Sequence, residues 1–270
     1  MFQYFGFGSN ISMVSLRAKG VNPSNSQPAV LKGWKLRFNV QHFFRNEGGV
    51  GNIEHTGNPE DRVIGILHEC PDESLEPLDA TEAYGYGYDR ISIDVEVLDD
   101  VSGEPRLVEA LTYVGMPGFI DNSCLPSRRY LNIILDGAKQ ADLDADYVAE
   151  LEKQPVLIPA EYPNFEPPKG EFPTFDTNSL KEYPTYTALM GAVFDMADAR
   201  PHHDFLKGYF GGKDMTLFHL KRLDSSDETE SIDDIKQDNL NDAQRKYLNS
   251  FLNEYALEYR YVGQYKYHHE

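Results

Sequence analysis

Two short segments of this sequence carry groups that could do chemistry together. The first, residues 7–10 (Phe-Gly-Ser-Asn), ends an apolar stretch with small and polar residues. Gly8 would let a ligand approach the backbone closely, and successive free N–H groups in such a loop can hold a carboxylate or an oxyanion. A glycine-containing turn explains the pattern equally well, so this loop alone does not define a site.

The second segment, residues 78–90, places Glu82 directly before a run rich in glycine and tyrosine. Aromatic side chains and close backbone would remove water from this glutamate, and desolvation makes a carboxylate a stronger general base. A tyrosine-rich loop with a solvated glutamate is the simpler interpretation when composition is taken alone. Glu47, Glu54 and Glu60 lie in segments that we predict to be loops outside the site.

The elements that must position these segments are predicted from hydrophobic periodicity. Residues 91–97 alternate apolar and polar side chains, as a strand with one solvated face requires. Further strands are expected at residues 63–67 and 107–114, so the first part of the chain is mostly strand. Helices are expected at about residues 126–140, where a Pro-Ser pair suits the helix start, and at 144–152.

The proline content divides the chain near residue 160. Residues 154–173 contain six prolines, which remove backbone donors and fix φ, so neither a helix nor a central strand is expected there. We therefore predict two domains, residues 1–153 and 174–270, joined by a proline-rich linker at 154–173. In the second domain, a capping box at Asn241 before an apolar stripe predicts a late helix.

Composition and charge exclude several classes of function. The net charge of −19 gives a surface that repels phosphate backbones, so nucleic acid is not expected as a partner. The two cysteines, Cys70 and Cys124, have neither metal-binding spacing nor the number that a disulfide framework needs. No stretch approaches the roughly 18 apolar residues of a membrane span, and no signal peptide is evident. These features predict a cytoplasmic protein.

Three segments in the first domain form a pattern when they are taken in order. They are residues 4–10 (YFGFGSN), residues 78–88 (LDATEAYGYGY) and residues 126–139, which precede the helix expected after Asp144. Together they resemble the γ-glutamylcyclotransferase (AIG2-like) family over about residues 2–153. The resemblance implies an α+β fold in which a small β-barrel has flanking helices. Phe7 stands where the family usually has tyrosine, so a hydroxyl contact would be lost there.

This family cleaves γ-glutamyl amides by attack of the substrate's α-amine on its own γ-carbonyl, which releases 5-oxoproline and an amine or amino acid. The resemblance implies that Glu82 is the catalytic acid/base and that no metal or other cofactor is needed. The implied substrate-binding residues are Phe7, Gly8, Ser9, Asn10, Tyr88 and Tyr130. The backbone groups of residues 7–10 would bind the α-carboxylate or the developing oxyanion, and Tyr88 and Tyr130 would line the pocket. A γ-glutamylamine or pathway-specific deprotecting cyclotransferase is one alternative, and a haem-binding or scaffold/regulatory protein with an inactive cyclotransferase fold is another.

The second domain carries a different pattern. Its segments 175–183, 191–196, 210–216 and 259–263 resemble the small α+β cytochrome b5-like domains, in particular the membrane-associated progesterone receptor branch. That family often binds haem through a tyrosine, but Lys207 stands at the ligand position here, so haem is not expected. If haem did bind, Tyr209 and Tyr259 would be the candidate ligands. Otherwise the domain would dock a protein partner or pack on the first domain.

Overall fold

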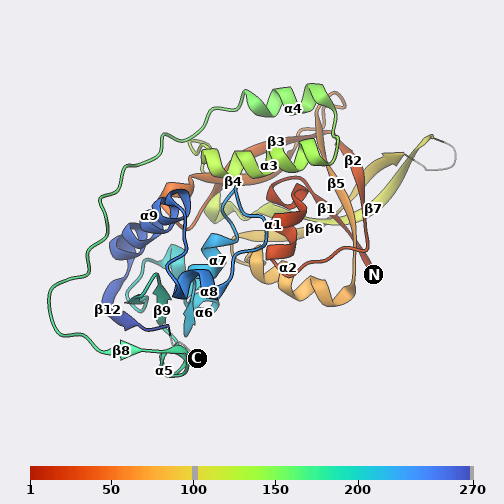
Figure 1. The fold of residues 1–270 in the computed structure, drawn as a ribbon. Coiled ribbons are helices and arrows are strands. Elements are labelled where there is room, and N and C mark those ends of the chain that lie inside the picture. The colour runs from red at the N-terminus through yellow and green to blue at the C-terminus, as the bar shows by residue number, and fades with distance from the viewer. Residues whose placement is uncertain (99–102, 268–270) are drawn as a thin grey trace. The chain divides into compact units, whose positions relative to one another are not determined.

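A computed structural model describes residues 1–98 and 103–267 of the chain (Figure 1). The chain forms two compact units. The first contains residues 1–42 and 47–158, and the second contains residues 43–46 and 159–270. The chain therefore passes between the units more than once, and four residues that we expected in the first domain belong to the second unit.

The first unit is built on a closed barrel with the strand order β1-β5-β2-β6-β7. These strands are β1 (Phe2–Gly6), β2 (Asn25–Lys32), β5 (Arg62–Cys70), β6 (Tyr88–Leu98) and β7 (Pro105–Gly115). β1 pairs antiparallel with β5 and parallel with β7, which closes the barrel. The predicted alternation in β6 is confirmed, because Ile93, Val95 and Val97 are buried in the barrel core while the side chains between them are not.

Helices and a second sheet flank this barrel, so the expected barrel with flanking helices is confirmed (Figure 1). β3 (Trp34–Gln41) and β4 (Gly49–His55) form an antiparallel pair of their own. The helices are α1 (Met13–Ala18), α2 (Leu75–Thr81), α3 (Arg128–Gln140) and α4 (Ala145–Glu152). Ser127 caps α3, since its Oγ accepts a hydrogen bond from the Tyr130 N–H at 3.1 Å.

The second unit contains a mixed sheet in the order β11-β9-β10-β12-β8. Its strands are β8 (Thr174–Phe175), β9 (Tyr186–Leu189), β10 (Ala192–Asp195), β11 (Lys213–Asp214) and β12 (Arg260–Tyr265). Its helices are α5 (Thr177–Lys181), α6 (Asp204–Phe210), α7 (Thr216–Leu220), α8 (Ile232–Lys236) and α9 (Asp242–Glu258). The predicted capping box at Asn241 is confirmed at the start of α9. The resemblance of this unit to cytochrome b5-like domains stays a prediction.

Phe44, from the connection between β3 and β4, lies inside the core of the second unit. Its side chain is 2% exposed, and its ring lies 5.2 Å from that of Tyr255 and 5.3 Å from that of Phe251. The backbone of the same segment is also held, because the Phe43 carbonyl accepts a hydrogen bond from His203 Nε2 at 2.7 Å. Residues 43–46 are therefore a built-in part of this unit rather than a surface loop of the first.

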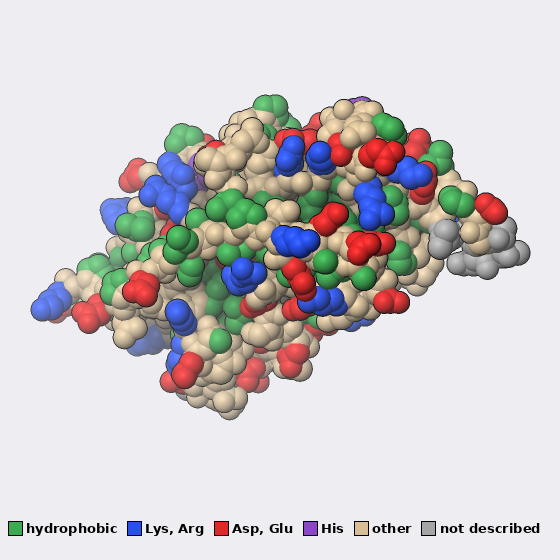
Figure 2. Space-filling view, turned by 90° about the horizontal axis from the view of Figure 1, so that it is seen from above, with side chains coloured by type: hydrophobic (Ala, Val, Ile, Leu, Met, Phe, Trp, Pro, Cys, Tyr) green, Lys and Arg blue, Asp and Glu red, His purple; other side chains and the backbone are tan. Residues whose placement is uncertain are grey.

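The surface carries charges of both signs. On the face shown in Figure 2, acidic and basic side chains are interspersed rather than gathered by sign. None of the helices in the described ranges combines the length and apolar composition that a membrane span requires.

Candidate functional site

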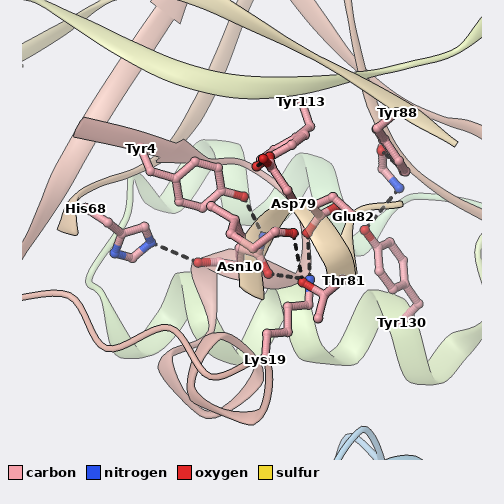
Figure 3. Close-up of polar contacts among 12 residues, drawn as sticks. Tyr4, Asn10, Lys19, His68, Asp79, Thr81, Glu82, Tyr88, Tyr113 and Tyr130 are labelled. Carbon is pink, nitrogen blue, oxygen red and sulfur yellow. Dashed lines mark hydrogen bonds and ion pairs between the residues drawn. The ribbon is translucent and has the colours of Figure 1, made fainter. Parts of the chain in front are cut away.

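Glu82 and the loop at residues 7–10 meet in the first unit (Figure 3). The Oε1 atom of Glu82 accepts a hydrogen bond from Asn10 Nδ2 at 3.0 Å, although the two residues are 72 positions apart in the sequence. The Glu82 side chain is 14% exposed and Asn10 is 5% exposed. The fold thus brings a largely desolvated carboxylate against the loop that could bind an anion.

The loop takes its position from the end of β1. A short 3-10 turn, Ser9–Ile11, begins after Gly8. A Cβ atom at Gly8 would lie 2.8 Å from the Tyr130 hydroxyl, which is closer than real Cβ contacts allow. Glycine at this position therefore lets the Tyr130 hydroxyl approach the backbone closely.

Glu82 takes its position from the end of α2. Its N–H still donates to the Leu78 carbonyl at 3.0 Å, which closes the last α-helical turn. The next residue, Ala83, is buried with a φ of 51°, in the left-handed region that costs a residue with a Cβ about 1–2 kcal/mol. This turn ends the helix and leads the chain away from Glu82, which leaves the carboxylate directed at Asn10.

Lys19 is a member of the site that the sequence did not reveal. Its Nζ lies 2.9 Å from Glu82 Oε1 and 2.6 Å from Asn10 Oδ1, and its side chain is 11% exposed. Asn10 therefore links the two charged groups, since its amide donates to Glu82 and its carbonyl accepts from Lys19. Lys19 follows the short helix α1 by one residue, and a single lysine after a six-residue helix gives no sequence signal of this role.

Four tyrosines surround Glu82, and their hydroxyl groups can form hydrogen bonds. Burial raises the pKa of Tyr4, Tyr88, Tyr113 and Tyr130, so all four phenols stay protonated at neutral pH. The hydroxyl of Tyr4 contacts Asn10 Nδ2. Because none of these phenols can serve as a base near neutral pH, the carboxylate remains the candidate for proton transfer.

Asp79 is the other carboxylate of this segment, and its carboxylate is paired with neighbouring side chains. Arg90 Nη1 donates to its Oδ1 at 2.7 Å, and the Tyr113 hydroxyl donates to the same oxygen. An ion pair with these contacts fixes the carboxylate in place. Asp79 therefore supports the wall of the site and does not compete with Glu82 for the role of base.

Gly51 joins the predicted residues Tyr88 and Tyr130. The Tyr88 hydroxyl donates to the Gly51 carbonyl at 2.7 Å, and the Gly51 N–H donates to the Tyr130 hydroxyl at 3.0 Å. A Cβ at Gly51 would also approach the Phe7 ring at 3.5 Å. The glycines at 48–51, in β4 and the turn before it, were the signal for this close packing.

His68 holds the loop from the other side. Its Nε2 lies 2.9 Å from the Asn10 carbonyl and its Nδ1 lies 2.8 Å from Ser26 Oγ. Burial lowers the pKa of His68 to about 4, so the ring is neutral at physiological pH. Since a carbonyl can only accept, Nε2 carries the proton and donates it, while Nδ1 accepts from the serine. His68 is therefore a support for the loop and not a proton carrier.

Glu47 lies in the predicted loop region, in a 3-10 turn (Arg45–Glu47), but its side chain has structural contacts there. This residue is 2% exposed, and its carboxylate accepts hydrogen bonds from Arg129 Nε at 3.0 Å and from Ser127 Oγ at 3.0 Å. Burial alone would raise the pKa of Glu47, but the adjacent Arg129 guanidinium holds it below the ordinary value. Glu54 lies in β4 and also has partners, Arg37 and Asn39. A loop prediction from composition missed both sets of contacts because their partners are distant in the sequence.

The predicted site residues fall into two groups. The residues of the loop at 7–10, together with Tyr88, Tyr130 and Glu82, come together in the first unit. The conditional haem ligands Tyr209 and Tyr259 lie in the second unit. Among residues 1–98 and 103–267, no group of three or more His, Cys, Asp or Glu side chains is placed to hold a metal ion.

The first unit is similar to known proteins in sequence and in fold. Residues 62–151 match the model of the AIG2-like family. A curated protein of Claviceps purpurea (strain 20.1), gamma-glutamyl cyclotransferase gliK, is 26% identical over 152 residues, which are 54% of this chain. The match spans 66% of that protein, slightly less than two thirds of its length.

Solved structures extend the comparison to the fold. A gamma-glutamyl cyclotransferase superposes with a TM-score of 0.50 and 24% identity, over 60% of this chain and 90% of that one. An uncharacterised protein from Homo sapiens superposes with a TM-score of 0.49 and 25% identity, over 60% of this chain and 92% of that one. The first unit therefore has a γ-glutamyl cyclotransferase-like fold, and its segment 62–151, which carries Glu82, matches the AIG2-like family.

Proposed function

We propose that the first unit releases 5-oxoproline from γ-glutamyl amides, with Glu82 as the acid/base. The observation that carries this proposal is the contact between the shielded Glu82 carboxylate and Asn10 of the 7–10 loop. Within the described ranges, only Oε1 of Glu82 has hydrogen-bond partners, so Oε2 remains available to a substrate proton. The similarity to a relative named as a gamma-glutamyl cyclotransferase supports the same reaction.

The chemistry follows from the protonation state of the substrate. Its α-amine arrives as an ammonium, which has no lone pair for attack, so one proton must first move to Glu82 Oε2. The free amine then attacks the γ-carbonyl carbon, which forms the new C–N bond and leaves the charge on the carbonyl oxygen. Glu82 passes that proton to the departing nitrogen, and the old C–N bond breaks as the carbonyl re-forms. Glu82 then takes the second proton from the new ring nitrogen and gives it to the released amine, which leaves as an ammonium. The products are 5-oxoproline and the released amine.

The remaining residues of the site would orient the substrate. Backbone groups of residues 7–10 would stabilise the oxyanion, and such an interaction contributes most when it acts only in the transition state. Tyr88 and Tyr130, held by Gly51, would keep the glutamyl chain curled so that amine and carbonyl meet. Bringing two groups of one molecule into contact in this way can supply roughly 7–11 kcal/mol of the barrier in well-oriented cases.

Incubation of the full chain with a panel of γ-glutamyl compounds tests this function directly. The panel should include γ-glutamyl dipeptides, glutathione and γ-glutamyl amines, and 5-oxoproline is measured by mass spectrometry. We expect release from at least one compound with a free α-amine, and none from its N-acetyl derivative, which cannot attack. Failure with every member would contradict the proposal, and the pattern of release would identify the leaving group.

For the second unit we propose a role that does not use haem. Tyr259 is buried, and its hydroxyl is hydrogen-bonded to His203 Nδ1 at 2.8 Å. Lys207, at the expected ligand position, forms an ion pair with Asp204 at 2.9 Å. Haem ligation by either residue would have to break these contacts, so we expect no Soret band after incubation with haemin. A stoichiometric band that disappears in Tyr209→Phe or Tyr259→Phe would contradict this expectation.

A further inference from the structure

Lys19 and Glu82 form an unusually well shielded ion pair. Their side chains are 11% and 14% exposed, whereas most ion pairs between the described side chains have at least one largely solvated partner. Glu47 and Arg129 are a second shielded pair, and their contacts with Ser127 at the start of α3 give them a structural role. Removing two charges from water is unfavourable and adds little stability, so a pair in a candidate site needs another explanation.

The pair has unused hydrogen-bonding capacity on both charges. Of the three N–H bonds of the Lys19 ammonium, two have acceptors among the described residues, namely Glu82 Oε1 and Asn10 Oδ1. Both contacts to Glu82 fall on the same oxygen, which leaves Oε2 open. One cationic donor and one anionic acceptor are therefore available side by side.

We propose that Lys19 binds the α-carboxylate of the γ-glutamyl substrate, so that Lys19 and Glu82 together recognise its charged α-amino acid head. This inference rests on the proposed function. The α-carbon of the substrate carries a carboxylate and an ammonium next to each other, which matches an ammonium and a carboxylate held 2.9 Å apart. In an antiparallel arrangement, each of the four charges gains a partner of opposite sign at hydrogen-bond distance.

This arrangement has a consequence for the proton transfer. The carboxylate held at Lys19 places the substrate ammonium at Glu82 Oε2, where the proton leaves nitrogen for oxygen and no other bond changes. Once Glu82 is protonated it no longer balances the charge of Lys19. The substrate carboxylate then serves as the counter-ion of Lys19, so the buried Lys19 ammonium always has an anionic partner. The backbone of residues 7–10 is left to bind the oxyanion.

The test pairs a change in the protein with a change in the substrate. Lys19→Met in the full chain is assayed on one γ-glutamyl amide and on the same compound with an α-carboxamide in place of the α-carboxylate. Hydrogen bonds to charged groups are worth enough for a loss of roughly 10- to 100-fold. We expect kcat/KM to fall by that factor for the carboxylate and to change less than about threefold for the carboxamide.

Two further measurements support the comparison. Lys32→Met is a matched control, because it removes a lysine that is 58% exposed and pairs with Glu96 on the barrel surface, and we expect both substrates to react as before. Binding of 5-oxoproline, which keeps the carboxylate but has lost the ammonium, is measured by calorimetric titration. Its Kd should rise in Lys19→Met by the same factor as the loss in kcat/KM.

Three outcomes would overturn the assignment of Lys19. The first is an equal loss of kcat/KM on both substrates, which would mean that Lys19 acts only by holding Glu82. The second is no loss of kcat/KM on either substrate. The third is an unchanged Kd for 5-oxoproline. A wild-type chain that releases no 5-oxoproline from any γ-glutamyl amide would instead contradict the proposed function. In that case the titration alone decides whether Lys19 binds the carboxylate.

Discussion

Glu82→Gln should lower kcat on a confirmed γ-glutamyl substrate by about 10²- to 10⁴-fold, the usual contribution of general acid–base catalysis. The glutamine keeps the size of the side chain, and its Oε1 can still accept from Asn10 Nδ2 and Lys19 Nζ. It cannot take up the ammonium proton, so the lost interaction belongs to the transition state. KM should therefore change much less than kcat.

Two other variants sharpen this result. Glu82→Asp should also be poor, because a carboxylate displaced by about 1 Å is badly placed for proton transfer. Glu60→Gln is the control for loss of one carboxylate, since Glu60 is exposed, and it should match the parent. Glu47→Gln is unsuitable for that purpose because Glu47 is buried against Arg129. If Glu82→Gln keeps activity within a few-fold of the parent while its melting temperature is unchanged, Glu82 is not the acid/base.

Phe44→Ala should destabilise the second unit by about 3–5 kcal/mol, the cost of removing a fully buried aromatic ring. The ring packs against Phe210, Phe251 and Tyr255, which come from α6 and α9, and the deletion leaves a cavity among them. Hydrogen exchange of the full chain, followed by mass spectrometry, resolves the two units. Protection in peptides of the second unit should fall by roughly 10²- to 10⁴-fold, since about 1.4 kcal/mol corresponds to a factor of ten.

The control for this variant lies on α9 itself. Leu257 is 68% exposed, so Leu257→Ala removes an apolar side chain without opening a cavity, and its effect should stay within about 0.5 kcal/mol. The expected pattern is unusual, because a substitution at residue 44 would loosen a unit formed mainly by residues 159–270. Unchanged protection of the second unit in Phe44→Ala would show that the segment 43–46 is not part of its core.

Local features of the fold were predictable because their causes are local. The alternation in β6 reflects one buried and one solvated face, and this pattern appears directly in the sequence. The starts of α3 and α9 were predictable because a cap bonds to a backbone N–H only three residues away, as Ser127 does to Tyr130 and Asn241 does to Gln244.

The site was predictable only in part. Glu82 and the 7–10 loop were selected because short motifs bring chemically suitable residues together and resemble a known family. Lys19 and Gly51 were missed, since neither belongs to a motif and their partners lie far away in the sequence, at Glu82 and Tyr130. Their roles follow from hydrogen bonds that exist only after the barrel has closed and α3 has packed.

The sequence by itself determined that the chain has a strand-rich first part, a proline-rich segment after residue 153, and two segments able to supply a base and an anion-binding loop. Only the tertiary structure decided that these two segments meet, that the Lys19 ammonium contacts both of them, and that Phe44 belongs to the second unit. The physical reason is that periodicity and capping act between near neighbours. Charge pairing and burial of an aromatic ring depend on distance in space and leave no mark on spacing along the chain.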